Sequence, residues 1–201
     1  IQIRLVGSEM CIRDRKAVDC GVDGLIVEGG EGGGFKNPQD VSTMVLLPLV
    51  RSQVDVPIIA AGGFIDGATM AAGFALGAEG IQMGTRMVSS AESPVHENWK
   101  NAIVNARETD TVFLNRAHSP ALRAMRTEKT TRLEFDVETN AMTEFGKATD
   151  LYFGGDMEAS IALTGQVCGR IDAVRPVTEI IAEVREEFFK VMGAMSQQYL
   201  A

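Results

Sequence analysis

Glycines at the ends of three short apolar runs are the residues whose type and spacing could hold a ligand. They occur in LIVEGGEGGGF (25–35), PIIAAGG (57–63) and GIQMGTR (80–86). A glycine lets backbone N–H groups approach a phosphate oxygen, because no Cβ stands in the way. Apolar runs that stop at glycines are also typical of parallel strands whose loops reach a ligand. The pattern therefore predicts a phosphate-binding backbone at one edge of a parallel sheet.

The second and third glycine ends form the most specific pair, because one helical segment separates them as in a β-α-β unit. The residues predicted to hold the phosphate are Gly62, Gly63, Gly84 and Thr85. The Thr85 hydroxyl adds a donor, and a helix that starts at Asp66 could direct its positive end at the anion. Tight turns without a ligand are the alternative for each loop taken singly. Arg86 would pair with the phosphate or with a structural carboxylate.

The first glycine loop, EGGEGGGF (28–35), suits a backbone that lies flat against a planar ligand. Ordering so many glycines is entropically costly, and a mobile surface loop is the alternative. Glu28 and Glu31 could form an acid–base pair, but the sequence favours exposed, solvated carboxylates. No Gly-Lys-Ser/Thr follows the glycines, which excludes a nucleoside triphosphate loop of that type.

The sequence assigns no catalytic side chain and no metal site. His96 and His118 are the only histidines. His96 lies near a predicted helix start and is expected to be structural or capping, while His118 carries no pairing that indicates catalysis. No group of residues has metal-ligand spacing, and no Ser, Cys or Thr shows a nucleophile–base arrangement.

Composition narrows the class of protein. The 201 residues are 45% hydrophobic and 23% charged, as in an ordinary globular protein. A formal net charge of −8 argues against nucleic acid and anionic membranes as partners. No apolar run approaches the roughly 20 residues of a membrane span. Three cysteines without metal-ligand spacing fit a reducing compartment, so we expect a cytoplasmic protein. Its expected partner is a small-molecule substrate.

Strands and helices alternate in the first half of the chain. The predicted strands are 24–28, 57–61 and 80–83, with helices from residue 40 or 42 to 54 and over 67–76. This order is typical of an α/β protein of the (β/α)8 TIM-barrel family, whose members usually need about 250 residues. Three strands cannot close a barrel. We therefore expect an incomplete barrel, formed by its last three strands, and a C-terminal helical segment.

The rest of the chain divides into predicted segments of different character. Residues 1–15 resemble translated sequencing-adapter sequence and are treated as a non-native leader. Residues 16–92 form the barrel part, 93–150 an inserted small domain, and 151–201 helices that pack on the barrel. Within these, helices are predicted from 93 to about 106, over 120–125 and 157–167, and from Pro176 onward, with a strand at 111–115.

The string VEGGEGGGFKN…VDVPIIAAGGFIDGATMAAGFALGAEGIQMGTR resembles the nitronate monooxygenase (2-nitropropane dioxygenase) family, which includes FMN-dependent enoyl-ACP reductases. The resemblance runs from about residue 16 to about 190. It implies FMN, with its phosphate held by Gly62, Gly63, Gly84 and Thr85. Gln82 and Met83 would lie along the same site, and Gly33 and Gly34 near the isoalloxazine.

One departure from the family pattern affects the expected catalysis but not the expected binding of FMN. Members usually read GGH where this chain has Phe35, and phenylalanine can neither abstract nor donate a proton. Lys36 follows it and is expected to point elsewhere. The resemblance implies an FMN-dependent oxidoreductase that passes electrons through flavin to O2, a quinone or an activated alkene. NAD(P)H is a candidate electron donor, and a homodimer is a candidate assembly.

Two alternatives remain from the sequence: an enoyl-thioester reductase, and a flavin-binding module that has lost catalysis with its histidine. As a C-terminal fragment, the chain alone is expected to be inactive.

Overall fold

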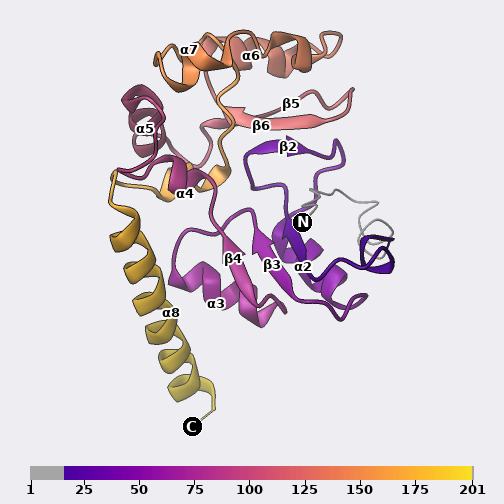
Figure 1. The fold of residues 1–201 in the computed structure, drawn as a ribbon, viewed down its shortest axis with the longest axis vertical. Helices are drawn as coiled ribbons and strands as arrows, with labels where there is room; N and C mark the ends of the chain where they lie inside the picture. The colour runs from indigo at the N-terminus through magenta and orange to yellow at the C-terminus, as the bar shows by residue number, and fades with distance from the viewer. Residues whose placement is uncertain (1–15, 201) are drawn as a thin grey trace.

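A three-stranded parallel sheet organises the first half of the molecule (Figure 1). The computed structural model describes residues 16–200, so the adapter-like segment 1–15 lies outside the described residues. The strands are β1 (Leu25–Glu28), β3 (Ile58–Ala61) and β4 (Gly80–Gln82), in the order β1-β3-β4. Helices α2 (Thr43–Arg51) and α3 (Gly67–Ala75) connect them. These five elements confirm the alternation predicted from the sequence.

One face of this sheet is covered and the other is open. Val27, Ile58 and Ala60 are almost fully buried against Leu46 and Leu47 of α2. Because successive strand residues point to opposite faces, Glu28, Ala61 and Gln82 share the opposite face. The pairing Glu28↔Ala61↔Gln82 places them in one row at the carboxyl ends of the strands. Ile59, on this open face, is 39% exposed.

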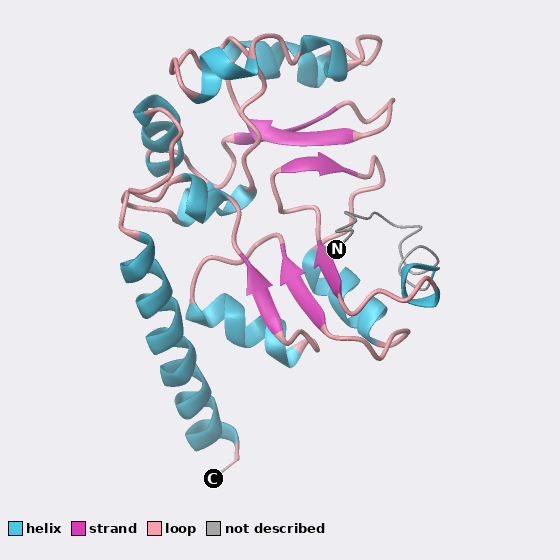
Figure 2. Ribbon diagram, in the orientation of Figure 1, coloured by secondary structure: helices cyan, strands magenta, loops and turns pink. Residues whose placement is uncertain are grey.

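A second sheet is antiparallel and lies above the first in Figure 2. Its order is β2 (Gly34–Lys36), β6 (Ala121–Met125) and β5 (Thr111–Leu114). Helix α6 (Glu128–Phe135) packs on β5, where Leu133 joins Val112 and Leu114 in a separate core. The end of the first glycine loop is therefore a strand, and it pairs with a segment from beyond the domain boundary predicted at residue 92.

Two helix predictions are wrong. Residues 121–125 form the central strand β6, whose five residues are all buried. Ala, Leu and Met favour helices, but pairing on both sides outweighs that weak preference. Residues 157–165 form turns and extended chain instead of a helix, and a short 3-10 helix begins at Gln166. The extended part runs beside β6, where Met125 N–H donates to the Ala162 carbonyl at 2.8 Å.

The remaining elements are short, apart from the last helix. They are α4 (Thr85–Val88), α5 (Glu97–Val104), η1 (Ala141–Glu144), α7 (Ala148–Tyr152), η2 (Gln166–Arg170) and α8 (Val177–Tyr199). His96 caps α5 by accepting from Asn98 N–H at 3.1 Å, which confirms its predicted role. Helix α8 lies along α3 (Figure 1). No helix within residues 16–200 is long and apolar enough to cross a membrane.

Candidate functional site

The second and third glycine ends lie side by side at the carboxyl edge of the parallel sheet, because β3 and β4 are neighbours. Gly62 and Gly63 have φ angles of 79° and 92°, which residues with a Cβ rarely adopt. A Cβ at Gly62 would also fall 2.9 Å from the Gly29 carbonyl oxygen. Glycine is thus required here by backbone geometry and by the close approach of the first loop.

The backbone N–H groups of Gly63, Gly84 and Thr85 lie at the carboxyl ends of two neighbouring strands, β3 and β4. These N–H groups donate to no acceptor among residues 16–200. A Cβ built on Gly84 would meet no atom within 4 Å, and one on Gly63 would meet only Glu31 Cβ, at 3.8 Å. Unpaired N–H groups at neighbouring strand ends, with empty space beside two of them, can hold an anion. This geometry suits the phosphate that the sequence predicts, and that assignment remains a prediction.

The other predicted site residues differ in what surrounds them. A Cβ on Gly33 would fall 2.7 Å from Gly165 N. Glycine at this position therefore lets the first loop pack directly against the backbone of Gly165. Gly34 has a φ of 96° and open space around it. Gln82 is exposed on the open face of the sheet, whereas Met83 packs against the core beneath it.

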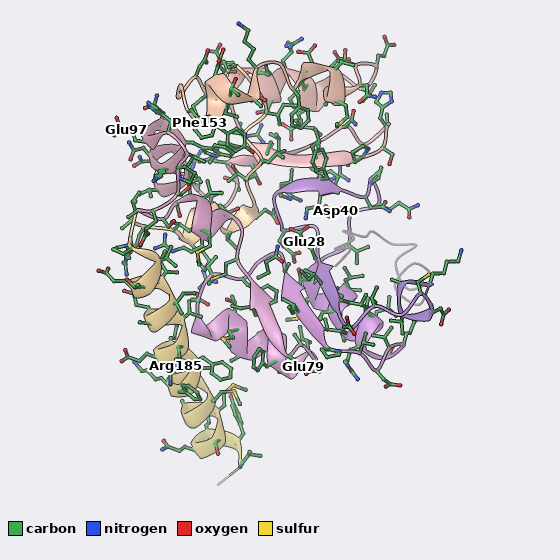
Figure 3. The ribbon with its side chains drawn as sticks, in the orientation of Figure 1. Glu28, Asp40, Glu79, Glu97, Phe153 and Arg185 are labelled. Carbon is green, nitrogen blue, oxygen red and sulfur yellow. The ribbon has the colours of Figure 1, made fainter. Side chains whose placement is uncertain are left out.

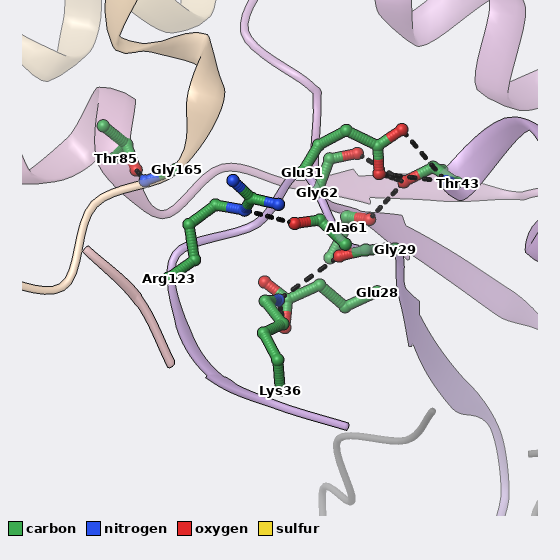
Figure 4. A network of polar contacts seen from close by, with 11 residues as sticks. Glu28, Gly29, Glu31, Lys36, Thr43, Ala61, Gly62, Thr85, Arg123 and Gly165 are labelled. Carbon is green, nitrogen blue, oxygen red and sulfur yellow. Dashed lines mark hydrogen bonds and ion pairs between the residues drawn. The ribbon is translucent and has the colours of Figure 1, made fainter. Parts of the chain in front are cut away.

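Thr85 has a partner that the sequence did not predict. Its Oγ1 accepts from the buried N–H of Gly165 at 2.9 Å, and the side chain is buried (Figure 4). Gly165 lies in the extended chain where a helix was predicted. The hydroxyl hydrogen of Thr85 stays available to donate to a ligand.

The start of α3 faces the C-terminal helix, so the expectation that its positive end meets the anion is wrong. Asp66 accepts from Thr69 N–H in a capping box. Gly67 N–H donates to Glu187 of α8 at 2.8 Å, and Arg170 forms an ion pair with Asp66. Two carboxylates therefore already occupy this helix end.

Arg86 forms no ion pair with a carboxylate among residues 16–200, so the expected pairing with a structural carboxylate is wrong. Its guanidinium donates to the Ser89 hydroxyl at 3.1 Å and to the Ala173 carbonyl at 2.9 Å. Arg86 is buried and ties α4 to the chain that precedes α8. Its role in this structure is to join those two segments.

The two carboxylates of the first loop are bound by the protein, which corrects the expectation that they are solvated (Figure 4). Glu31 accepts from Thr43 N–H at 2.9 Å and lies 2.8 Å from the Thr43 hydroxyl, at the start of α2. Glu28 forms an ion pair with Lys36 at 2.7 Å, with side-chain exposures of 13% and 5%. The loop folds back because β2 is held in the second sheet.

Two basic residues join the candidate site: Arg123, which the sequence analysis did not single out, and Lys36, which was expected to point elsewhere. Lys36 Nζ also donates to the Gly29 carbonyl at 3.3 Å, and Arg123 Nε donates to the Gly30 carbonyl at 2.5 Å. Arg123 further lies 3.5 Å from Asp40. A strand over 34–36 would have placed Phe35 and Lys36 on opposite faces. The three residues alone do not predict a strand, and only their pairing with β6 reveals one.

Strand geometry separates Phe35 from Lys36. Phe35 is 41% exposed and stacks on Phe145 with ring centroids 6.0 Å apart. Lys36 points to the opposite face of β2, toward Glu28, so it does not point away from the site as expected. Figure 3 shows Glu28 between the two sheets. Burial lowers the pKa of Lys36 and raises the pKa of Glu28, while their mutual contact opposes both changes.

His118 borders a different cavity. Its Nε2 is buried and has no partner among the described residues. The cavity measures about 190 Å³ and is lined by residues of the β5–β6 turn and α6, including Phe113, Arg116 and Leu133. Within residues 16–200, no cluster of His, Cys, Asp or Glu could hold a metal ion.

Comparison with known proteins relates this geometry to a family. The sequence model described as nitronate monooxygenase matches residues 5–187. A probable nitronate monooxygenase of Staphylococcus aureus strain MSSA476 is 30% identical over 94% of the chain and 58% of its own length. A Rhodococcus jostii RHA1 protein named (3aS,4S,5R,7aS)-5-hydroxy-7a-methyl-1-oxo-octahydro-1H-indene-4-carboxyl-CoA dehydrogenase is 40% identical over 60% of the chain and 33% of its own length.

Solved structures give the same fold. FabK from Thermotoga maritima superposes with a TM-score of 0.89 at 37% identity, over 97% of this chain and 63% of that one. A nitroalkane oxidase from Streptomyces ansochromogenes superposes with a TM-score of 0.77 at 23% identity, which supports the fold alone. The chain spans between one third and somewhat under two thirds of the length of these relatives.

Proposed function

Because the chain belongs to the nitronate monooxygenase family, we propose that it forms the phosphate-binding part of an FMN-dependent oxidoreductase. The observation that carries this proposal is that the N–H groups of Gly63, Gly84 and Thr85 have no acceptor among residues 16–200, with empty space beside Gly63 and Gly84. The three parallel strands would be the last three of a (β/α)8 barrel, where the loops of the final strands usually hold phosphate. Bound FMN would supply the transfer of electrons between two substrates.

The chain's own residues would bind and orient the cofactor. The three free N–H groups would donate to phosphate oxygens, with the Thr85 hydroxyl as a fourth donor. Gln82, exposed on the open sheet face, would lie along the same site, as would Gly33 and Gly34 of the first loop. Arg123 and Lys36 hold the carbonyls of Gly30 and Gly29, which fixes the loop that would border the ring.

Electron acceptors of this oxidoreductase would be small molecules such as O2, a quinone or an activated alkene, with NAD(P)H as the proposed donor. An enoyl-thioester reductase is the second candidate, favoured by the similarity to a relative named as a carboxyl-CoA dehydrogenase. A cytoplasmic protein and a homodimeric assembly belong to the same proposal.

The test of FMN binding is Gly84→Val in the full-length gene product that contains this chain. The protein should purify yellow. Gly84 has φ −87° and no neighbour within 4 Å of a Cβ, so valine should fold normally and intrude only on the bound phosphate. We expect FMN affinity to fall at least about tenfold, or roughly 1.4 kcal/mol, measured by titration of flavin absorbance.

Gly193→Val is the matched control, because Gly193 is also exposed with no atom within 4 Å of a Cβ but lies in α8. Its FMN affinity should equal that of the wild type. A colourless wild type that ignores added FMN would overturn the cofactor proposal. Equal affinities in the two variants would overturn the assignment of Gly84 to the phosphate.

A further inference from the structure

Lys36 is a buried amine beside the glycine loop, next in sequence to Phe35. We infer that Lys36, paired with Glu28, is the residue that protonates the substrate in the second candidate reaction, the reduction of an α,β-unsaturated thioester or ketone. This inference rests on the proposed function.

The position of the pair in the sheet supports this role. Glu28 lies at the end of β1 on the open face, in the same cross-strand row as Ala61 and Gln82. Lys36 Nζ contacts the Gly29 carbonyl, and that oxygen closely approaches Gly62. The amine therefore lies at the same edge of the sheet as the unpaired N–H groups of Gly63 and Gly84, beside the neighbouring strand β1.

Two of the three N–H groups of the Lys36 ammonium have acceptors in the protein, so the third can donate to a substrate. An ammonium has three N–H groups. One reaches Glu28 Oε2 at 2.7 Å and one reaches the Gly29 carbonyl at 3.3 Å. The third has no acceptor within residues 16–200.

The charged groups that act on the Lys36 amine lie on β1, on the first glycine loop and on β6. Glu28 of β1 and Glu31 of the loop favour the ammonium, whereas Arg123 of β6 disfavours it. Arg123 is itself partly balanced by Asp40. Burial has the largest effect and lowers the pKa of Lys36, which brings a lysine closer to the pH range where proton transfer is efficient.

Bound reduced flavin would supply the hydride equivalent that balances this reaction, with NAD(P)H as the proposed source of its electrons. The hydride forms a C–H bond at the β-carbon of the substrate, and the alkene electron pair moves to the carbonyl oxygen to give an enolate. The Nζ–H bond of Lys36 then breaks and its proton forms a C–H bond at the α-carbon, restoring the C=O bond. Lys36 is left as a neutral amine and regains a proton from water beside Glu28.

A nitronate, in contrast, is already an anion and gains no carbon-bound proton when it is oxidised. A proton donor at this position therefore favours reduction of an alkene over oxidation of a nitronate.

The test compares Lys36→Met with Lys36→Arg in the FMN-loaded full-length gene product. Arginine keeps the positive charge and a partner for Glu28, but its pKa is too high to donate a proton. After reduction by NADPH, reoxidation by crotonyl-CoA is compared with reoxidation by menadione, which needs no proton on carbon. We expect the ratio of the two rates to fall about 100-fold or more in both variants. Lys147→Met, at an exposed lysine, should leave the ratio unchanged.

Restoration of the ratio by arginine would show that Lys36 only holds the loop and would overturn the inference. A wild type that binds FMN and reduces menadione, yet reduces neither crotonyl-CoA nor an α,β-unsaturated ketone, would also overturn it while leaving the proposed function intact. Failure to bind FMN would instead overturn the proposed function.

A readout independent of activity is the titration of Lys36 Nζ by ¹⁵N NMR. We expect Lys36 to lose its proton below the ordinary lysine range, and Glu28→Gln to move that titration to still lower pH because a favourable charge is lost. Titration of Lys36 at about 10.4, the value of an unperturbed lysine, would contradict a proton-donor role.

Discussion

Thr85 shows how one side chain at the residue scale serves both the fold and the proposed ligand. Its Oγ1 accepts from Gly165 N–H, and its hydroxyl hydrogen can still donate to a ligand. This bond joins the end of β4 to a segment 80 residues further along the chain. A donor buried without its acceptor costs the full desolvation of that group.

Thr85→Val should therefore destabilise the protein by about 1–3 kcal/mol, because valine leaves the Gly165 N–H unpaired. Thr85→Ser keeps the acceptor and should cost less than half as much. Urea unfolding followed by circular dichroism measures both changes. Equal losses for valine and serine would mean that the methyl group, and not the hydrogen bond, is what matters.

The sequence identified the glycines of the site but not the partners of its charged residues. Gly62, Gly63 and Gly84 could be recognised because glycine has few alternatives in such turns. The contact from Arg123 to the Gly30 carbonyl spans 93 residues, and the bond from Thr43 to Glu31 spans 12. Such pairings depend on how the two sheets meet, which local patterns do not reveal.

At the scale of elements, a helix or strand was predicted correctly where the spacing of apolar residues and the capping residues indicated the same element. The prediction failed where pairing with distant strands determines the secondary structure. The Asp66 capping box and the glycine stop at Gly77 marked α3 correctly. Strand β6 reads as a helix by composition, and only its place between β2 and β5 makes it a strand. The same pairing turned the end of the first glycine loop into β2.

The contact of α3 with α8 gives a prediction at this scale. A Cβ on Gly67 would fall 2.1 Å from Phe188 N, which belongs to the backbone of α8. Gly67→Ala should push the two helices apart and destabilise the protein by about 1–3 kcal/mol in chemical denaturation. Gly193→Ala has open space and should instead stabilise by roughly 0.5–1 kcal/mol. A stabilised Gly67→Ala variant would show that α8 does not pack this closely.

For the molecule as a whole, the buried Glu28–Lys36 pair should shape the dependence of stability on pH. The raised pKa of Glu28 contributes stability below its ordinary value near 4.3, and that contribution is lost as pH rises through the folded value. The lowered pKa of Lys36 means that the unfolded chain binds more protons between the folded value and about 10.4. Stability therefore rises with pH across that second window.

The double variant Glu28→Gln/Lys36→Met removes both titrations and isolates their effect. We expect the free energy of unfolding of the wild type, minus that of the variant, to decrease from pH 4 toward neutrality and to increase again toward pH 10. Exposed groups such as Asp110 and Asp136, whose pKa values are lowered by hydrogen bonds, affect both proteins equally and cancel in the difference. Urea unfolding at unit pH steps provides the measurement. A difference that is largest near neutrality would mean that attraction within the pair outweighs burial and keeps Lys36 charged, which would also remove the physical basis for proton donation near neutral pH.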